Sequence, residues 1–99
     1  MSRLLDDEER TLARAALPGW SGDEVTLTRA FAFPAFLVGV EAVREVAAVA
    51  EQMDHHPDID IRWRTVTFTV STHSEGGITQ LDVELAHRIS EIATGYGAT

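Results

Sequence analysis

The chain contains no cysteine, so it has no disulfide bonds, no thiolate nucleophile and no zinc site built on cysteine. Basic residues are scarce, because 8 Lys plus Arg stand against 16 Asp plus Glu and give a formal net charge of −8. An acidic surface repels phosphate backbones and anionic lipids, so we expect neither nucleic acid nor a membrane as a partner. The first nine residues lack the apolar run of a secretory signal, and we expect a cytoplasmic protein.

The composition is that of an ordinary globular domain. Of the 99 residues, 44% are hydrophobic and 24% are charged, which favours a single domain over residues 1–99. A chain of this length buries only about two thirds of its unfolded surface, so an oligomer interface would add useful stability. No stretch has the glycine spacing of a dinucleotide-binding or phosphate-binding loop.

The first half of the chain predicts two helices around a strand. A helix is expected over residues 6–17, with Asp6 as its N-cap and Glu9 completing a capping box. A strand is expected over residues 25–33, preceded by a short strand around Trp20. Pro34 suits the first position of a long helix that ends near Asp54. Apolar residues at three- and four-residue steps predict its buried face: Phe36, Val40, Val43, Ala47, Ala50 and Met53.

The second half predicts a hairpin and a last helix. Two alternating stretches, residues 59–63 and 66–70, indicate strands that turn near residues 64–65, and Trp20 and Trp63 are expected in the core. Residues 75–77 form a loop, and Thr79 can cap a final helix. Strands without an intervening helix pair antiparallel, so we expect an α+β fold with helices on one face of the sheet. The opposite face of the sheet, rich in threonine, is expected to stay open.

Three histidines lie where elements meet: His55 and His56 after the long helix, and His73 after the last strand. Carboxylates stand near them, at Glu51, Asp54 and Asp82. Imidazoles beside carboxylates are suited to acid-base chemistry near neutral pH. The sequence therefore indicates a catalytic cluster at these transitions.

Each of these residues also has a structural explanation. His55 and His56 could cap the end of the helix, and His73 could stabilise a turn. Asp82, three residues after Thr79, is best explained as the capping carboxylate of the last helix when it is considered alone. A three-histidine metal centre is a further alternative, although neighbouring histidines at a helix end point apart and chelate one ion poorly. His87, in the middle of the last helix, is expected in solvent.

The spacing of these residues resembles that of the pterin-4a-carbinolamine dehydratases, also called 4a-hydroxytetrahydrobiopterin dehydratases. The pattern runs from Glu51 through His55-His56-Pro57, Trp63 and His73 to Asp82. Further segments are similar to the same family: residues 17–20, 31–33, 71–73, 76–79 and 82–86. The resemblance covers nearly the whole chain.

The resemblance implies a two-layer α+β fold, with a four-stranded antiparallel sheet and three helices on one face, in dimers or tetramers. It implies loss of water from 4a-hydroxytetrahydropterin to give quinonoid dihydropterin, with no metal or organic cofactor. By resemblance, His55, His56 and His73 are catalytic. The positions that match the pterin pocket are Glu51, Asp54, Pro57, Ser71, Thr72 and Asp82.

Within this cluster, we hypothesise that His55 and His73 are the main proton handlers and that His56 orients the substrate. The chain departs from the family at Ser74-Glu75, where an acidic residue followed by a small one is common, so the polarity of the pocket is expected to differ. Many relatives also carry Tyr-Asn in place of Trp63-Arg64. A module that binds pterin or a protein partner without catalysis is the alternative function.

Overall fold

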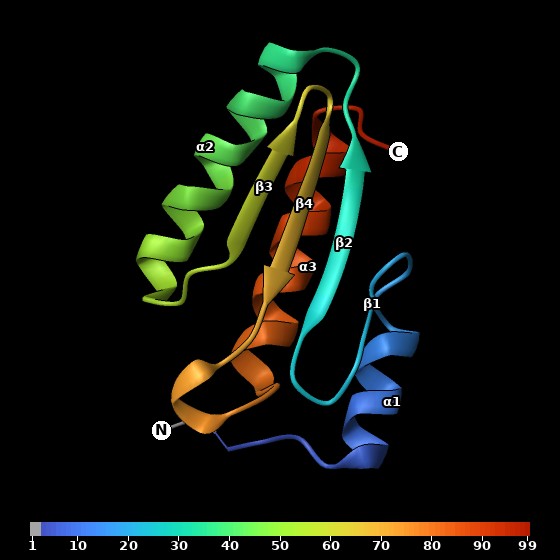
Figure 1. The fold of residues 1–99 in the computed structure, drawn as a ribbon, viewed down its shortest axis with the longest axis vertical. Helices are drawn as coiled ribbons and strands as arrows, with labels where there is room; N and C mark the ends of the chain where they lie inside the picture. Colours follow the sequence, from blue (N-terminus) through green and yellow to red (C-terminus); the bar gives the residue numbers. More distant parts are fainter. Residues whose placement is uncertain (1–2) are drawn as a thin grey trace.

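The computed structural model describes residues 3–99, so Met1 and Ser2 of the predicted domain lie outside the described residues. The elements follow in this order: α1 (Asp7–Ala15), β1 (Ser21–Gly22), β2 (Leu27–Ala32), α2 (Phe36–Met53), β3 (Asp58–Arg62), β4 (Thr65–Val70), the 3₁₀ helix η1 (His73–Glu75) and α3 (Gln80–Gly95). The four strands form one antiparallel sheet in the order β1-β2-β4-β3. Helices α2 and α3 run along one face of this sheet, and α1 lies at the end near β1 (Figure 1). The predicted α+β architecture is confirmed.

Both predicted capping boxes are present. The Asp6 carboxylate accepts from the Glu9 N–H at 2.8 Å, and the Glu9 carboxylate accepts from the Asp6 N–H at 3.0 Å. Thr79 and Asp82 make the equivalent pair at the start of α3. Pro34 is not the first residue of α2, because Ala35 is the N-cap and the helix begins at Phe36. Local capping chemistry therefore sets the start of two of the three helices.

The predicted buried face of α2 is confirmed in part, because Ala50 is buried and Val43 and Met53 pack half-buried against the core, whereas Ala47 is exposed. The helix buries Gly39, Ala42, Val46, Val49 and Ala50, whereas Phe36 is 45% exposed. A β-carbon on Gly39 would come within 3.3 Å of the Phe33 ring and 3.4 Å of Val66. The small residues thus let the helix approach the sheet closely, and the larger apolar residues on the neighbouring face do not.

The β3–β4 hairpin turns one residue earlier than predicted. Trp63 and Arg64 form the turn, and Trp63 has a left-handed backbone with φ 54°. Its side chain is 73% exposed, so the prediction that Trp63 is a core residue is wrong, whereas Trp20 is buried as predicted. The turn points the indole outward, where the Arg64 guanidinium lies 5.0 Å from the ring centroid.

The core lies between the sheet and the helices. Phe31, Phe33 and Phe68 are fully buried, and the ring centroids of Phe31 and Phe68 are 6.0 Å apart in an edge-to-face arrangement. Val25 was predicted to be buried in the strand, but β2 begins at Leu27, and Val25 lies before it and is 48% exposed.

Within residues 3–99, no helix is both long enough and apolar enough to cross a bilayer.

Candidate active site

His55 and Asp82 meet at the junction of α2, β4 and α3, although 27 positions separate them in the chain. The His55 Nε2 lies 2.6 Å from Asp82 Oδ1, and the two side chains are only 10% and 0% exposed. The reversal of the chain after α2 brings the imidazole here. Asp54 ends that helix in a left-handed conformation with φ 50°, and the His55 N–H donates to the Ala50 carbonyl at 3.0 Å.

The Asp82 carboxylate is saturated with hydrogen bonds. Its Oδ2 accepts from the Thr72 hydroxyl at 2.7 Å and from the Thr79 N–H at 2.9 Å, while Oδ1 faces His55. The Thr72 and Thr79 hydroxyls are 2.8 Å apart. The predicted capping role of Asp82 is therefore confirmed, and the same carboxylate also fixes the His55 ring. A buried carboxylate needs such partners to be tolerated in the interior.

This contact sets the tautomer of His55. Because a carboxylate only accepts hydrogen bonds, we assign the proton of this contact to Nε2. Within residues 3–99, Nδ1 makes no hydrogen bond, and no buried side-chain polar atom lacks a partner. Nδ1 is therefore open to solvent, with its lone pair available for a proton.

A cleft of about 360 Å³ borders His55. It lies between the end of α2 and the loop that contains η1, and the first turn of α3 also contributes. Its polar and apolar lining includes Asp54, His55, Thr72, Ser74, Glu75 and Leu81. A cleft of this size falls within the range that small-molecule ligands occupy.

His56 has a different environment from its neighbour. Its Nε2 lies 2.5 Å from Glu51 Oε2, and the two side chains are 56% and 76% exposed. The pair joins the last turn of α2 to the segment that leads to β3. Neither residue lines the cleft.

Three other predicted site residues, His73, Ser71 and Pro57, are not among the residues that line the cleft. His73 is exposed at the start of η1, between Thr72 and Ser74, which both line the cleft. Ser71 is buried and its hydroxyl donates to the Val25 carbonyl at 2.7 Å. Pro57 is half-buried and follows the two histidines. Within residues 3–99, no three His, Asp or Glu side chains group around a point that could hold a metal ion.

The structure also adds residues that the sequence did not indicate as ligand contacts. The cleft is also lined by Met53, Ser74, Glu75 and Leu81. Of these, the sequence drew attention only to Ser74 and Glu75, because they depart from the family pattern. Met53 and Leu81 were expected on buried helix faces, and both are half-buried. Apolar periodicity does not distinguish the rim of a cleft from the core.

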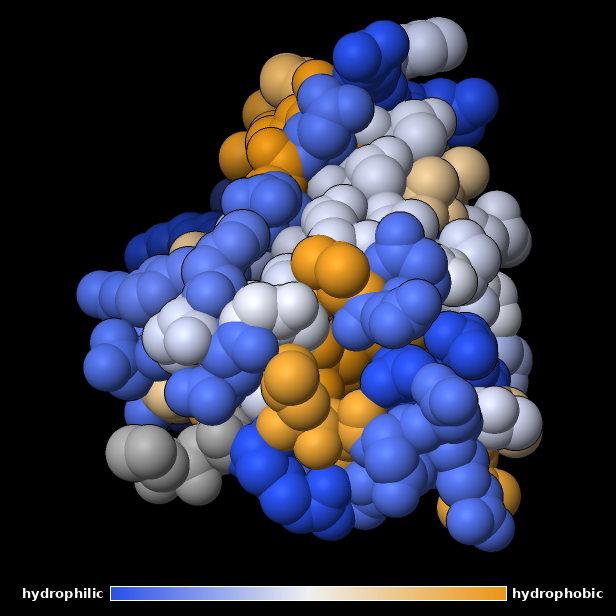
Figure 2. All heavy atoms as spheres, turned by 60° about the horizontal axis from the view of Figure 1, so that its bottom comes forward, coloured by the Kyte–Doolittle hydropathy of each residue, from blue (hydrophilic) through white to orange (hydrophobic). Residues whose placement is uncertain are grey.

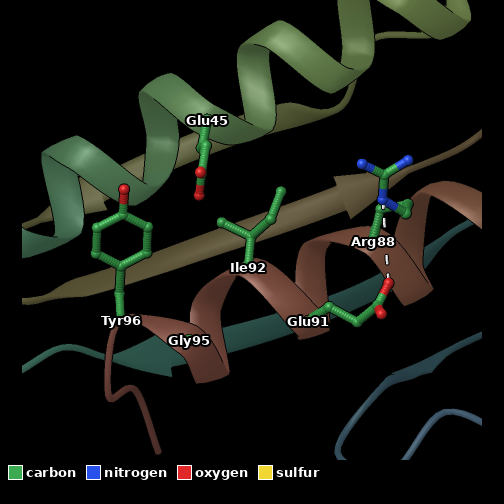
Figure 3. Close-up of a pocket in the computed structure, with 6 residues that line it drawn as sticks. All are labelled: Glu45, Arg88, Glu91, Ile92, Gly95 and Tyr96. Atoms are coloured by element: carbon green, nitrogen blue, oxygen red, sulfur yellow. Dashed lines mark ion pairs between the residues drawn. The ribbon is translucent and has the colours of Figure 1, made fainter.

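Other hollows on the surface contain no predicted site residue. A groove of about 470 Å³ between α2 and α3 is lined by Glu45, Arg88, Glu91, Ile92, Gly95 and Tyr96 (Figure 3). A smaller groove of about 300 Å³ lies between α1 and the start of α3, where Leu12 is 64% exposed. Figure 2 shows an apolar patch on this end of the molecule, surrounded by hydrophilic side chains.

Comparison with known proteins identifies the family. A sequence model described as pterin 4 alpha carbinolamine dehydratase matches residues 3–92. A Mycobacteroides abscessus protein, provisionally named pterin-4-alpha-carbinolamine dehydratase, is 59% identical over 86 residues, which are 87% of this chain and 92% of that protein. A protein of the same provisional name from Mycobacterium avium is 56% identical over 89 residues, 90% of this chain and 95% of that protein.

A solved structure agrees with this assignment. The crystal structure of a transcriptional coactivator/pterin dehydratase from Brucella melitensis has a TM-score of 0.86 and 35% sequence identity, and the match covers 90% of this chain and 97% of that chain. A pterin dehydratase-like protein described as a RuBisCO assembly factor in the alpha-carboxysome shares the fold, with a TM-score of 0.62, 23% identity and coverage of 75% and 86%. The chain belongs to the pterin-4α-carbinolamine dehydratase family.

Proposed function

We propose that this protein dehydrates 4a-hydroxytetrahydrobiopterin to quinonoid dihydropterin and water, by histidine acid-base catalysis, in the recycling of tetrahydrobiopterin. One observation carries the proposal: the His55 ring borders a cleft of ligand size and is fixed by a buried carboxylate. Family membership supplies the substrate class. A rigid imidazole with one open nitrogen is the arrangement that general acid-base catalysis requires.

The reaction needs only proton transfers. The C4a–O bond breaks while the lone pair on N5 forms a C4a=N5 double bond, the N5 proton leaves to a base, and the departing hydroxide takes a proton from an acid. The products are water and the quinonoid dihydropterin, so atoms and charge balance. Positioned acid-base groups typically accelerate such steps by about 10² to 10⁴.

His55 is suited to one of these transfers through Nδ1. When Nδ1 accepts a proton, the imidazolium stays paired with Asp82 across 2.6 Å, and that charge is stabilised away from water. We assign the second transfer to His73, whose neighbours Thr72 and Ser74 line the cleft, and an orienting role to His56. The pterin would contact Asp54 and Thr72, with Glu51, Pro57, Ser71 and Asp82 as supporting residues.

The test is a stopped-flow assay of 4a-carbinolamine dehydration with the purified protein. We expect turnover by the native chain and a loss of about 10² to 10⁴ in kcat for His55→Ala. His87→Ala is the matched control, because His87 is an exposed histidine on α3 and is not among the lining residues of the cleft. Equal activity of the His55→Ala and native proteins would contradict the proposal. Pterin binding without turnover would favour the alternative of a non-enzymatic binding module.

We also propose a homodimer or homotetramer. Strand β3 is an edge of the sheet, and its Ile59 and Ile61 are 36% and 41% exposed. Exposed isoleucines on an edge strand, here alternating with charged residues, offer a surface that a second copy can cover. Native mass spectrometry should give two or four times the 10.9 kDa mass of the chain, and a monomer at micromolar concentration would contradict this assignment.

A further inference from the structure

Two carboxylates at the cleft have no partner among the residues that the structure describes. Asp54 and Glu75 both line it, and within residues 3–99 no hydrogen bond or ion pair engages either side-chain carboxylate. The other acidic residues of the region are occupied, since Asp82 binds His55 and Glu51 binds His56. Asp54 and Glu75 are therefore available to a ligand.

The backbone holds both residues in place. The Glu75 N–H donates to the Thr72 carbonyl at 3.0 Å, and the loop around it is closed by the Thr72 N–H and the Gly77 carbonyl at 2.9 Å. Asp54 occupies the left-handed position that ends α2, a conformation that Asp tolerates better than most residues with a side chain. The loop itself uses the Thr72 N–H, so this group does not bind a ligand in the cleft.

His55 is the only basic side chain among the residues that line the cleft. No arginine is among the residues that line it. The larger groove in Figure 3 differs, because there Arg88 lies among Glu45 and Glu91. The formal charge of −8 on the whole chain adds to the negative potential. An anion that entered the cleft would meet two carboxylates and no fixed positive charge.

We propose that Asp54 and Glu75 make the cleft selective for pterins whose side chain carries no negative charge. This inference rests on the proposed function. The pyrimidine edge of a pterin presents N–H donors that a carboxylate accepts, whereas a phosphate or carboxylate substituent is repelled. In this chain the second carboxylate is on Glu75, which lines the cleft beside Ser74.

The experiment compares two ligands that differ by one phosphate group, and the amide variants isolate the effect of its charge. Binding of 6-hydroxymethylpterin and of its monophosphate is measured by pterin fluorescence at low salt, with the native protein, Asp54→Asn and Glu75→Gln. We expect the native protein to bind the neutral pterin at least about tenfold more tightly, since like charges close together are strongly unfavourable. Each amide variant should reduce the ratio of the two dissociation constants several-fold, and 0.5 M NaCl should also reduce this ratio.

Glu91→Gln is the control, because it removes the same charge from the groove in Figure 3 and leaves the cleft unchanged. Its selectivity should equal that of the native protein. Equal binding of both pterins to the native protein would overturn the selectivity and leave the proposed function intact. Failure of both pterins to bind would overturn the two proposals together, and an equal shift in Glu91→Gln would show that only net charge matters, contrary to the proposal.

Discussion

Helices α1 and α3 begin with the same motif in two different environments. Each has a capping box, and in each the carboxylate at the third helical position also binds a nitrogen-bearing side chain: Glu9 binds Arg3, and Asp82 binds His55. The α1 box is on the surface, whereas Asp82 is completely buried. Because Asp82 is buried, the carboxylate that caps α3 also holds the His55 ring in one position.

The comparison explains how Asp82 can be a capping residue and the partner of His55 at the same time. As a capping residue, it needs only the Thr79 N–H, and Glu9 shows that this role can be filled in solvent. As a partner of His55, it needs a dry site in which the hydrogen bond is not exchanged with water. Thr72 completes that site by occupying the remaining acceptor capacity of Oδ2.

The largest effect is expected from Asp82→Asn. The amide oxygen can accept from Thr72 and Thr79 only if the NH₂ group faces His55, and Nε2 must then accept while Nδ1 carries the ring proton. The opposite orientation places the NH₂ group against both donors. We expect kcat for 4a-carbinolamine dehydration to fall on the order of 10²-fold, since the first orientation removes the open lone pair that we propose as the base. The free energy of unfolding should fall by about 1–3 kcal/mol for each buried donor left unsatisfied. Stopped-flow assays and urea titrations measure the two effects.

Glu9→Gln is the matched control for this change, because it makes the same kind of substitution in the exposed box. Its kcat should equal that of the native protein. If Asp82→Asn lost stability but kept full kcat, the capping box of α3 would only stabilise the helix. The burial of Asp82 would then have no effect on catalysis.

A smaller effect is expected from Thr72→Val, which sharpens the comparison by removing one hydroxyl from the buried network. The variant keeps the shape of the side chain but deletes the bonds to Asp82 Oδ2 and to the Thr79 hydroxyl. We expect the free energy of unfolding to fall by about 1–2 kcal/mol and kcat to fall a few-fold, since Asp82 still binds His55. Thr67→Val, on the exposed face of β4, tests whether loss of a threonine hydroxyl matters by itself. A loss as large as that of Asp82→Asn would contradict the assignment of separate roles.

The sequence predicted the features that local chemistry determines. The starts of α1 and α3 follow from capping residues three positions apart, and the hairpin follows from alternating apolar residues. The face of α2 was not predictable in this way, because apolar residues surround most of the helix. The choice depends on Phe33 and Val66, which contact Gly39 across the layer interface. Trp63 was mispredicted because the left-handed turn that exposes it is a property of the hairpin.

In the candidate site, too, the sequence predicts some features and the tertiary structure decides the others. The spacing predicted one cluster of His55, His73 and Asp82, and the structure joins two of these side chains, His55 and Asp82. The bond between His55 and Asp82 spans 27 positions and two strands, so no local period encodes it. Glu75 was noticed only as a departure from a pattern, and its place in the cleft depends on how η1 folds back toward α2.

The smallest effect concerns acid stability, and it is confined to the exposed box. Hydrogen bonds from the Arg3 guanidinium, and then from the Asp6 N–H, lower the pKa of Glu9 from 4.5 to about 2. A carboxyl whose pKa is depressed by folding stabilises the native state above its unfolded pKa and loses that contribution as pH falls from about 4.5 to about 2. Urea midpoints of the native protein and Glu9→Gln should therefore differ at pH 7 and converge near pH 2.

Glu8→Gln is the control for this prediction. Glu8 is in the same turn of α1 but lacks these hydrogen bonds among the described residues, so the difference in urea midpoint between the native protein and Glu8→Gln should change less with pH. Because Glu9 is on the surface, 0.5 M NaCl should reduce the difference at pH 7, whereas the loss of kcat in Asp82→Asn should resist salt. A pH-independent gap between the native protein and Glu9→Gln would mean that the exposed carboxylate contributes through its shape and not through its charge.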